Sequence, residues 1–374
     1  MLANEKKFKI GVVAFELGII KGFENVRSAH IQVPMQYIKR LSESGSKVTL
    51  FTNEFGKNTS PSTCLDQTEI VIIPDPRKRN NKSVMHSGFS KKINVINIIY
   101  GIFRLVSLSK LHKIEILHFF NGGLSVGIYA AIVALYSKKT KVFWTPSAHI
   151  STNSYVVKLI LSRLNSVVAS TEYHQLNFSK VFKDVPIIRY GTTRDLNLTN
   201  LKTTKRRVTF WRDPSYENGM DIAIKVFESL APEFPNIIFT FMIRPYFDTI
   251  KVKTNYKNIE VHQYPYSTDI DLESVLSETA VCLFPFREFS TNPQLSIIET
   301  LEAGIPCVCS DIESAKEYGI KNKLLIKNNN IQDYIDAIRY VLLDYDNLTP
   351  IDPKKIGFSW NGFVEKNNEL YKTR

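Results

Sequence analysis

Residues 285–311 read Pro285-Phe-Arg-Glu-Phe-Ser-Thr-Asn-Pro-Gln-Leu-Ser-Ile-Ile-Glu-Thr-Leu-Glu-Ala-Gly-Ile-Pro-Cys-Val-Cys-Ser-Asp311. The pattern predicts the end of a strand, a polar loop, a helix over 294–303, a stop at Gly304 and a second strand. The first amides of a helix have no acceptor within the helix, and together they favour an anion. This stretch therefore predicts a βαβ unit with an anion site where the helix begins.

The same alternation of apolar runs and helical patterns continues along the chain, which indicates βα units and parallel sheets. In the first half we expect strands at Lys9–Phe15, Lys47–Thr52, Glu69–Ile73, Glu115–Phe119, Lys141–Thr145 and Ser166–Ser170, and helices at His30–Ser44, Asn94–Lys110, Leu124–Ser137 and Tyr155–Leu164. In the second half we expect strands at Arg207–Trp211, Asn236–Ile243, Asn258–His262, Ala280–Pro285, Ile305–Cys309 and Leu324–Ile326, and helices at Asn218–Leu230, Leu272–Ser277, Gln294–Ala303 and Ile331–Leu343. We take the basic stretch Asn197–Arg206 as the linker.

These series predict an α/β protein with two doubly wound Rossmann-like domains that face each other. Ligands of such sheets bind outside the carboxyl ends of the strands. The Gly-x-Gly-x-x-Gly fingerprint, the Walker A sequence and the Gly-x-Ser-x-Gly elbow do not occur, which argues against a dehydrogenase, a phosphate-loop hydrolase and a serine hydrolase. The 374 residues include four cysteines, too few for a disulfide framework; Cys307 and Cys309 are expected in the core, and no metal site is expected.

Charge is distributed unequally between the two halves. Residues 1–200 carry 27 Lys and Arg against 12 Asp and Glu, a net of +15, whereas residues 201–374 carry 21 against 24, a net of −3. The whole chain therefore has a net charge of +12. An excess confined to one half indicates an anionic partner for that half.

Glu299 lies one turn into the expected helix, where a carboxylate can accept hydrogen bonds from a sugar diol such as ribose. Taken alone, a Glu there is also explained by solvation or by the helix dipole. The stretch resembles the donor site of the group 1 (family 4-like) retaining glycosyltransferases with the GT-B fold, on Glu299, Gly304, Pro306 and Ser310-Asp311. Thr291 stands where that family has a first Glu, which contacts the transferred sugar.

The resemblance extends to Phe210–Asp221, where the family has an Arg and, about five residues later, a Lys on the donor diphosphate. Arg212 matches, and Asn218 (or Glu217, with a shift of one residue) takes the Lys position. The resemblance implies catalytic roles for His149, Arg212 and Glu299, with Glu299 on the nucleotide ribose. It implies a donor site at Arg212, Asn218, Gln294, Leu295, Ser296 and Glu299. Thr291, Asn292 or the amides of Gln294–Ser296 are our candidates to replace the first Glu, and Arg244 is our candidate to replace the Lys, although an Arg at a strand end is also commonly a surface cation.

Matches in the first half are weaker. Gly11–Phe15 and Ser44–Thr52 resemble the first βαβ unit of the family, with Arg27-Ser28 where a Gly-Gly pair is usual. Trp144-Thr-Pro-Ser-Ala-His149 resembles the strand end that carries a His near the sugar, although a single His is more often structural. Ser170–Glu172 and Arg189–Gly191 resemble later markers of that domain, and Phe358–Tyr371 resembles its returning C-terminal helix.

Basic clusters occur at 77–82, 91–92, 110–113 and 138–141, around an apolar helical segment at Ile93–Leu111. One interpretation is a surface that binds anionic lipid close to a lipid-linked acceptor. The other is an internal Rossmann helix with solvated lysines at its ends. We expect no nucleic-acid partner, because no nucleic-acid motif accompanies the charge.

We therefore expect an acceptor domain at 1–195, a nucleotide-sugar domain at 204–355 and a helix returning to the first domain at 356–374. The expected activity is transfer of a sugar, with retention, from a nucleotide diphosphate sugar to a hydroxyl of a glycan or lipid-linked acceptor, in polysaccharide or glycolipid synthesis. No cofactor beyond this co-substrate is expected. The expected location is cytoplasmic, at the inner face of a membrane. A non-catalytic partner subunit and a sugar-nucleotide epimerase are the alternatives.

Overall fold

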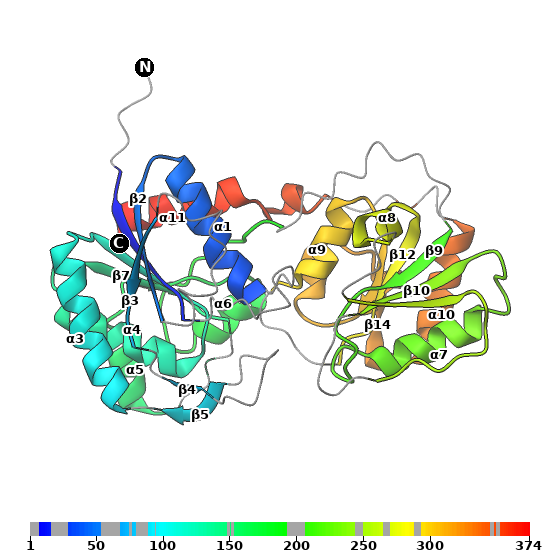
Figure 1. Cartoon of the computed structure of the whole chain (residues 1–374), viewed down its shortest axis with the longest axis horizontal. Coiled ribbons are helices and arrows are strands. Elements are labelled where there is room, and N and C mark those ends of the chain that lie inside the picture. The colour runs from blue at the N-terminus through cyan, green and yellow to red at the C-terminus, as the bar shows by residue number, and fades with distance from the viewer. Residues whose placement is uncertain are drawn as a thin grey trace, which may run out of the picture. The chain divides into compact units, whose positions relative to one another are not determined.

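The computed structural model describes residues 7–15, 29–53, 68–74, 77–79, 89–93, 95–147, 150, 153–192, 206–243, 250–264, 270–287, 293–344, 348 and 352–374. The chain divides into two compact units, drawn in Figure 1. The N-terminal unit comprises Met1–Thr193 and Ser359–Arg374, and the C-terminal unit comprises Arg194–Phe358. Each unit is described by itself.

The N-terminal unit is built on a parallel six-stranded sheet of order β3-β2-β1-β6-β7-β8. Its strands are β1 (Lys9–Val13), β2 (Lys47–Thr52), β3 (Glu69–Ile72), β6 (Ile116–Phe120), β7 (Lys141–Thr145) and β8 (Ser166–Val167). The central strands are almost continuously apolar because helices cover both of their faces. A separate antiparallel pair is formed by β4 (Arg77–Arg79) and β5 (Phe89–Ile93).

One face of this sheet packs against α3 (Val95–Leu111), α4 (Leu124–Tyr136) and α5 (Tyr155–Leu161). The core between them contains Phe119 and Trp144 of the strands and Leu105 of α3. The opposite face packs against α1 (Ala29–Glu43) and the C-terminal α11 (Trp360–Thr373), which also contact each other. The chain therefore returns to its first unit at its end, as expected from the sequence.

The C-terminal unit repeats this architecture with a sheet of order β11-β10-β9-β12-β13-β14. Its strands are β9 (Arg207–Phe210), β10 (Ile238–Ile243), β11 (Ile259–Gln263), β12 (Thr279–Phe284), β13 (Cys307–Ser310) and β14 (Leu325–Ile326). Its α-helices in the described residues are α7 (Met220–Leu230), α8 (Leu272–Ser277), α9 (Leu295–Glu302) and α10 (Ile331–Leu343). The two parallel α/β sheets confirm the expected fold class.

Most expected elements are present with small shifts at their ends. The expected strand at Ser166–Ser170 is shorter, because the chain leaves β8 at Val167 and then makes only a single bridge from Ala169 to Ile187. Among the described strands and α-helices, three were not expected: β4, β5 and α6 (Glu172–Phe178). The two strands are polar and basic in sequence, and α6 has only seven residues, so none shows an extended apolar period. Cys307 and Cys309 are buried in the core, as expected.

His118 forms the centre of a buried polar network in the N-terminal unit. It lies on β6 and is fully buried, and its Nδ1 contacts the hydroxyl of Tyr371 in α11. Its Nε2 lies 2.7 Å from Thr145 Oγ1, and the Tyr371 hydroxyl lies 2.6 Å from that of Tyr37 in α1. Burial lowers the pKa of His118 from 6.5 to about 3. The network therefore joins both covering helices to the sheet around a neutral imidazole.

This pKa predicts that the N-terminal unit loses stability as pH falls. Between about pH 6.5 and pH 3 the unfolded chain binds a proton at His118 that the folded unit does not. The free energy of unfolding should thus fall by up to about 1.4 kcal/mol per pH unit in that window. Urea unfolding at pH 7 and pH 5, followed by tryptophan fluorescence, measures this fall in the free energy of unfolding. The measurement uses a Trp211→Phe background, because the remaining tryptophans, Trp144 and Trp360, both lie in the N-terminal unit.

His118→Asn should reduce that pH dependence, because its amide can hydrogen-bond but does not titrate. His262→Asn, in the other unit, is the matched control and should retain the wild-type slope. A His118→Asn variant with the wild-type slope would assign the acid sensitivity to other groups.

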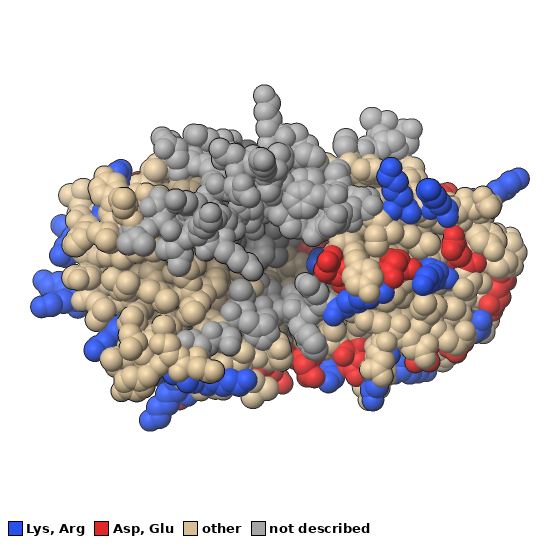
Figure 2. Space-filling model, turned by 90° about the horizontal axis from the view of Figure 1, so that it is seen from below, with Lys and Arg blue, Asp and Glu red and all other residues tan. Residues whose placement is uncertain are grey.

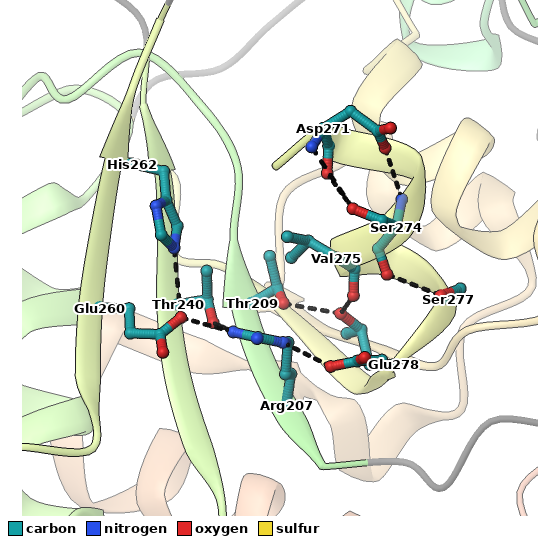
Figure 3. A network of polar contacts seen from close by, with 11 residues as sticks. Arg207, Thr209, Thr240, Glu260, His262, Asp271, Ser274, Val275, Ser277 and Glu278 are labelled. Carbon is teal, nitrogen blue, oxygen red and sulfur yellow. Dashed lines mark hydrogen bonds and ion pairs between the residues drawn. The ribbon is translucent and has the colours of Figure 1, made fainter. Parts of the chain in front are cut away.

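Arg207 holds together the amino-terminal edge of the second sheet (Figure 3). Its Nε donates to Glu278 Oε2 at 2.9 Å, and its Nη1 donates to Glu260 Oε2 at 2.7 Å and to Thr240 Oγ1 at 3.0 Å. Burial would raise the pKa of Glu260, but the bonds to Arg207 and His262 outweigh it and hold this pKa below its usual range. The network joins β9, β10 and β11 to the end of α8.

Arg207→Met should destabilise the C-terminal unit by about 2–4 kcal/mol, because it leaves two carboxylates without the cation between them. Hydrogen exchange of the amides of β9–β11, followed by mass spectrometry, reports the opening free energy locally. Adding Glu260→Gln to Arg207→Met should recover part of the loss, and the exposed Lys225→Met is the control. Unchanged protection in Arg207→Met would show that the network does not stabilise this edge.

Candidate functional site

The strand order of the C-terminal unit brings two loops together. β9 pairs with β10 on one side and with β12 on the other, so the order of the sheet reverses at β9. Ligand sites in doubly wound folds lie at such a reversal, beyond the carboxyl ends of the strands. The loop after β9 carries Arg212, and the segment after β12 leads into α9. The two regions found in the sequence therefore meet at one edge of the sheet.

The Arg212 guanidinium lies at the start of α9. Its Nη2 donates to Gln294 Oε1 at 2.8 Å, and its Nη1 lies 3.5 Å from Ser296 Oγ. Its Nε lies 3.4 Å from Asn218 Oδ1, and the guanidinium carbon lies 5.3 Å from the centre of the Phe286 ring. These contacts come from the β9–α7 loop, the segment after β12 and the first turn of α9. They fix the orientation of the cation.

Neighbouring contacts hold α9 against the same loop. Trp211 Nε1 donates to Thr300 Oγ1 at 3.1 Å, and Thr300 Oγ1 donates to the Ser296 carbonyl oxygen at 2.6 Å. The backbone amide of Gln294, the residue before α9, donates to the Tyr318 hydroxyl at 2.7 Å. The amides of Leu295 and Ser296 belong to the first turn and have no acceptor within the helix. A fixed cation beside these amides is an arrangement that binds anions.

Glu299 is buried, with 3% of its surface exposed. It follows Ser296 by three residues and precedes Thr300, so all three share one side of α9. Ser296 contacts Arg212 and Thr300 contacts Trp211, which places this side of the helix toward the loop after β9. The structure thus brings Glu299 to the same part of the unit as Arg212.

Asn218 organises the β9–α7 loop internally. Its Nδ2 donates to the Asp213 carbonyl oxygen at 3.2 Å and to Ser215 Oγ at 3.0 Å, while its backbone amide donates to Ser215 Oγ at 3.2 Å. Its Oδ1 faces Arg212 Nε. At the position where the resembling family has a Lys, this chain therefore has a neutral side chain that shapes the loop and orients Arg212.

A second set of contacts fastens this loop to the segment after β12. The Arg287 amide donates to the Glu217 carbonyl oxygen at 2.8 Å, and its guanidinium carbon lies 3.8 Å from the centre of the Tyr216 ring. Arg287 also makes a two-pronged ion pair with Asp221 in the first turn of α7. Burial would raise the pKa of Asp221, but the bonds and charge of Arg287 outweigh it and hold this pKa below its usual value.

Of the site residues expected from the sequence, the structure brings together Arg212, Asn218, Gln294, Leu295, Ser296 and Glu299. The others, Arg27, Ser28, His149, Arg244, Thr291 and Asn292, lie outside the described residues, and their roles stay predictions. Sequence reasoning missed three residues that shape the site: Phe286, Arg287 and Tyr318. The first two lie within the stretch that was singled out, and Tyr318 carries no local signal. Within the described ranges, His, Cys, Asp and Glu form no group of three that could hold a metal ion.

The sheet order and the arrangement around Arg212 define a doubly wound α/β domain with a candidate nucleotide site. Residues 193–355 match the family model described as "Glycosyl transferases group 1". The match lies almost wholly within the C-terminal unit and indicates a group 1 glycosyltransferase domain that uses a nucleotide-sugar donor. This confirms the resemblance to the retaining group 1 enzymes, which rested mainly on Glu299, Gly304 and Pro306.

Solved structures share the fold along the whole chain. TarM of S. aureus superposes with a TM-score of 0.68 at 14% identity over 99% of each chain. The sucrose-phosphate synthase of Thermosynechococcus elongatus gives 0.67 at 12% identity over 98% of each chain. HepE of Anabaena, in complex with UDP and glucose, gives 0.65 at 12% identity over 98% of this chain and 100% of its own. At these identities the likeness establishes the GT-B fold alone. No curated protein matches the chain in sequence.

Gly219, at the end of the β9–α7 loop, lies directly against the segment after β12. Its φ is +73°, and a Cβ there would lie 1.8 Å from the Pro285 carbonyl oxygen. Gly219→Ala should thus displace the loop that carries Arg212 and lower the free energy of unfolding of this unit by about 2 kcal/mol or more. Thermal unfolding with and without UDP should show a lower Tm and a smaller shift on adding UDP. Gly362→Ala, where a Cβ meets only ordinary contacts, is the control.

Proposed function

We propose that this protein transfers a sugar, with retention of its anomeric configuration, from a nucleotide diphosphate sugar to the hydroxyl of an acceptor. The observation that supports this most is the placement of Arg212 beside the first turn of α9, on the side of that helix that carries Glu299. One cation and a row of free amides suit a diphosphate, and a buried carboxylate close by suits a ribose diol.

In this proposal each group has a distinct task. Arg212 and the amides of Leu295 and Ser296 hold the diphosphate and stabilise the charge that develops on it as the glycosidic bond breaks. Glu299 accepts hydrogen bonds from the ribose hydroxyls. Thr291 and Asn292 precede α9 and are the candidates for contacting the transferred sugar. Arg244 follows β10, the strand next to β9, and is proposed as the second cation in place of the family's Lys.

The acceptor is assigned to the N-terminal unit, within residues 1–195, with His149 near the sugar and with Arg27-Ser28, which precede α1 in the sequence, on the acceptor side. A glycan precursor or a lipid-linked acceptor delivered at the inner face of a membrane suits the positive charge of this half. Among the residues described, no helix is both long enough and apolar enough to span a bilayer. Two of the similar structures, HepE and TarM, contain UDP, which makes UDP-sugars the first donors to test.

Arg212→Leu and Glu299→Ala should each weaken binding of UDP or the preferred nucleotide about 10-fold to 100-fold, because each removes hydrogen bonds to a charged group. A thermal-shift panel of nucleotide sugars selects the donor, and calorimetry then measures its affinity. The exposed Lys225→Leu and Glu273→Ala are matched controls from the same unit and should bind normally. Arg212→Lys should retain part of the affinity.

Turnover is the second readout. Wild type should release the nucleoside diphosphate from the bound donor, slowly to water and faster with an acceptor, and the product anomer is assigned by NMR. A Glu299→Ala variant with wild-type nucleotide binding and turnover would refute the proposed donor site. An inverted product would contradict retention.

A further inference from the structure

Helix α3 has apolar side chains on its buried side and on its exposed side. Ile102, Leu105 and Val106 face the sheet and are buried. The other face repeats at helical spacing and is exposed to solvent: Ile96 by 78%, Ile99 by 52%, Tyr100 by 55% and Phe103 by 58%. Packing against its own sheet therefore does not explain the second face.

The exposed face continues onto α4. The Phe103 and Tyr136 rings lie 6.1 Å apart, and Leu135 and Tyr136 are exposed by 46% and 56%. We call the set Ile96, Ile99, Tyr100, Phe103, Leu135 and Tyr136 the α3–α4 face. Contiguous apolar surface of this kind on a water-exposed protein marks a site of interaction.

Basic residues surround the α3–α4 face. Arg104 and Lys110 lie on the exposed side of α3, and Lys138 and Lys139 follow α4 directly and are exposed. The antiparallel β4–β5 pair, which precedes α3 in the chain, includes Arg77-Lys-Arg79 and Lys91-Lys92 in its sequence. On the described part of the N-terminal unit (left in Figure 2), blue side chains lie along the border of a broad tan surface.

The charge of this region is one-sided. Residues 76–171 contain 14 Lys and Arg but only one acidic residue, Glu115, which gives a net of +13. This exceeds the +12 of the whole chain, so the rest of the protein is close to neutral. A second copy of the chain on this face would bring two such segments together and be opposed by their repulsion. An anionic bilayer supplies both the negative charge and the apolar layer that this face lacks.

We propose that the α3–α4 face is a membrane-binding surface on which Ile99, Phe103 and Tyr136 enter the headgroup region of an anionic bilayer. Arg104, Lys110, Lys138 and Lys139 contact the lipid phosphates. The helix lies parallel to the bilayer plane, and its buried side keeps its contacts with the sheet. This inference deepens the proposed function, in which the acceptor is delivered at a membrane.

The test uses the full chain and vesicles of phosphatidylcholine with or without about a third of phosphatidylglycerol. Binding to anionic vesicles at low salt should be at least 10-fold stronger than to neutral ones and should weaken in 0.5 M salt. Phe103→Trp should shift its emission to the blue and be quenched by brominated lipid on binding. Leu343→Trp, exposed by 75% in the other unit, should do neither.

Ile99→Ser/Phe103→Ser and Lys138→Glu/Lys139→Glu should each weaken anionic-vesicle binding at least 10-fold. The matched controls are Leu343→Ser/Val261→Ser and Lys251→Glu/Lys257→Glu, at exposed positions of the C-terminal unit, and they should bind as wild type does. All substituted side chains are exposed, so each variant should keep its Tm, which is checked first.

Equal binding to neutral and anionic vesicles, or normal binding of Ile99→Ser/Phe103→Ser, would overturn the proposal. So would self-association that light scattering detects in wild type and that this variant abolishes, because a second copy would then cover the face. Nucleotide binding is measured on the same variants and should not change. Failure of vesicle binding with intact nucleotide binding refutes the membrane surface alone, whereas absent nucleotide binding refutes the donor site.

Discussion

The pairing of β9 with β12 in the middle of the second sheet decides where the chemistry of this unit lies. Parallel strands end at the same edge, so the loop after β9 and the segment after β12 must meet there, although 82 residues separate Arg212 from Gln294. The other contacts then fix this meeting: Arg287 ties the segment to the loop, and Gly219 allows their backbones to touch. The first sheet has the same order about β1 and β6, so the same constraint operates in the N-terminal unit.

At the position where the resembling family has a Lys, the neutral side chain of Asn218 holds the β9–α7 loop in shape. A Lys at this position would place a second cation near the anion site, whereas the amide of Asn218 is bonded to Asp213 and Ser215 and faces Arg212. Loop rigidity and cation orientation are therefore maintained by neutral hydrogen bonds. In the proposed reaction, stabilisation of the leaving diphosphate then depends more on Arg212 and on the amides of α9, whose fixed orientation needs no reorganisation.

The sequence was sufficient for the fold class and for most strands and helices, and it singled out six residues that the structure brings together at the start of α9, because these features follow from local patterns. Buried strands are continuous apolar runs, and Arg212, Gln294 and Glu299 stand at motif positions next to such runs. Residues whose hydrogen-bond partners lie far away in the sequence could not be identified from any local sequence pattern. His118 sits in the apolar run Ile-Leu-His-Phe-Phe, and its partner Tyr371 lies 253 residues away, so the sequence did not distinguish it from other histidines. Tyr318 supports α9 from a segment with no motif of its own. The strands β4 and β5 were not predicted because their basic side chains leave no clear alternation of apolar and polar residues.

The excess positive charge and the candidate anion site lie in different halves of this protein. The unit with the candidate anion site belongs to the half with a net charge of −3, so in the proposed function its affinity for a diphosphate comes from oriented cations and helix amides at short range and not from net charge. The half with a net charge of +15 has most of its excess in residues 76–171, which include the exposed apolar face of α3. Short-range dipoles select a ligand, whereas diffuse charge attracts an extended anionic surface and falls off within a Debye length. A small anionic donor and an extended anionic surface would thus be bound by two different kinds of electrostatics on two different units.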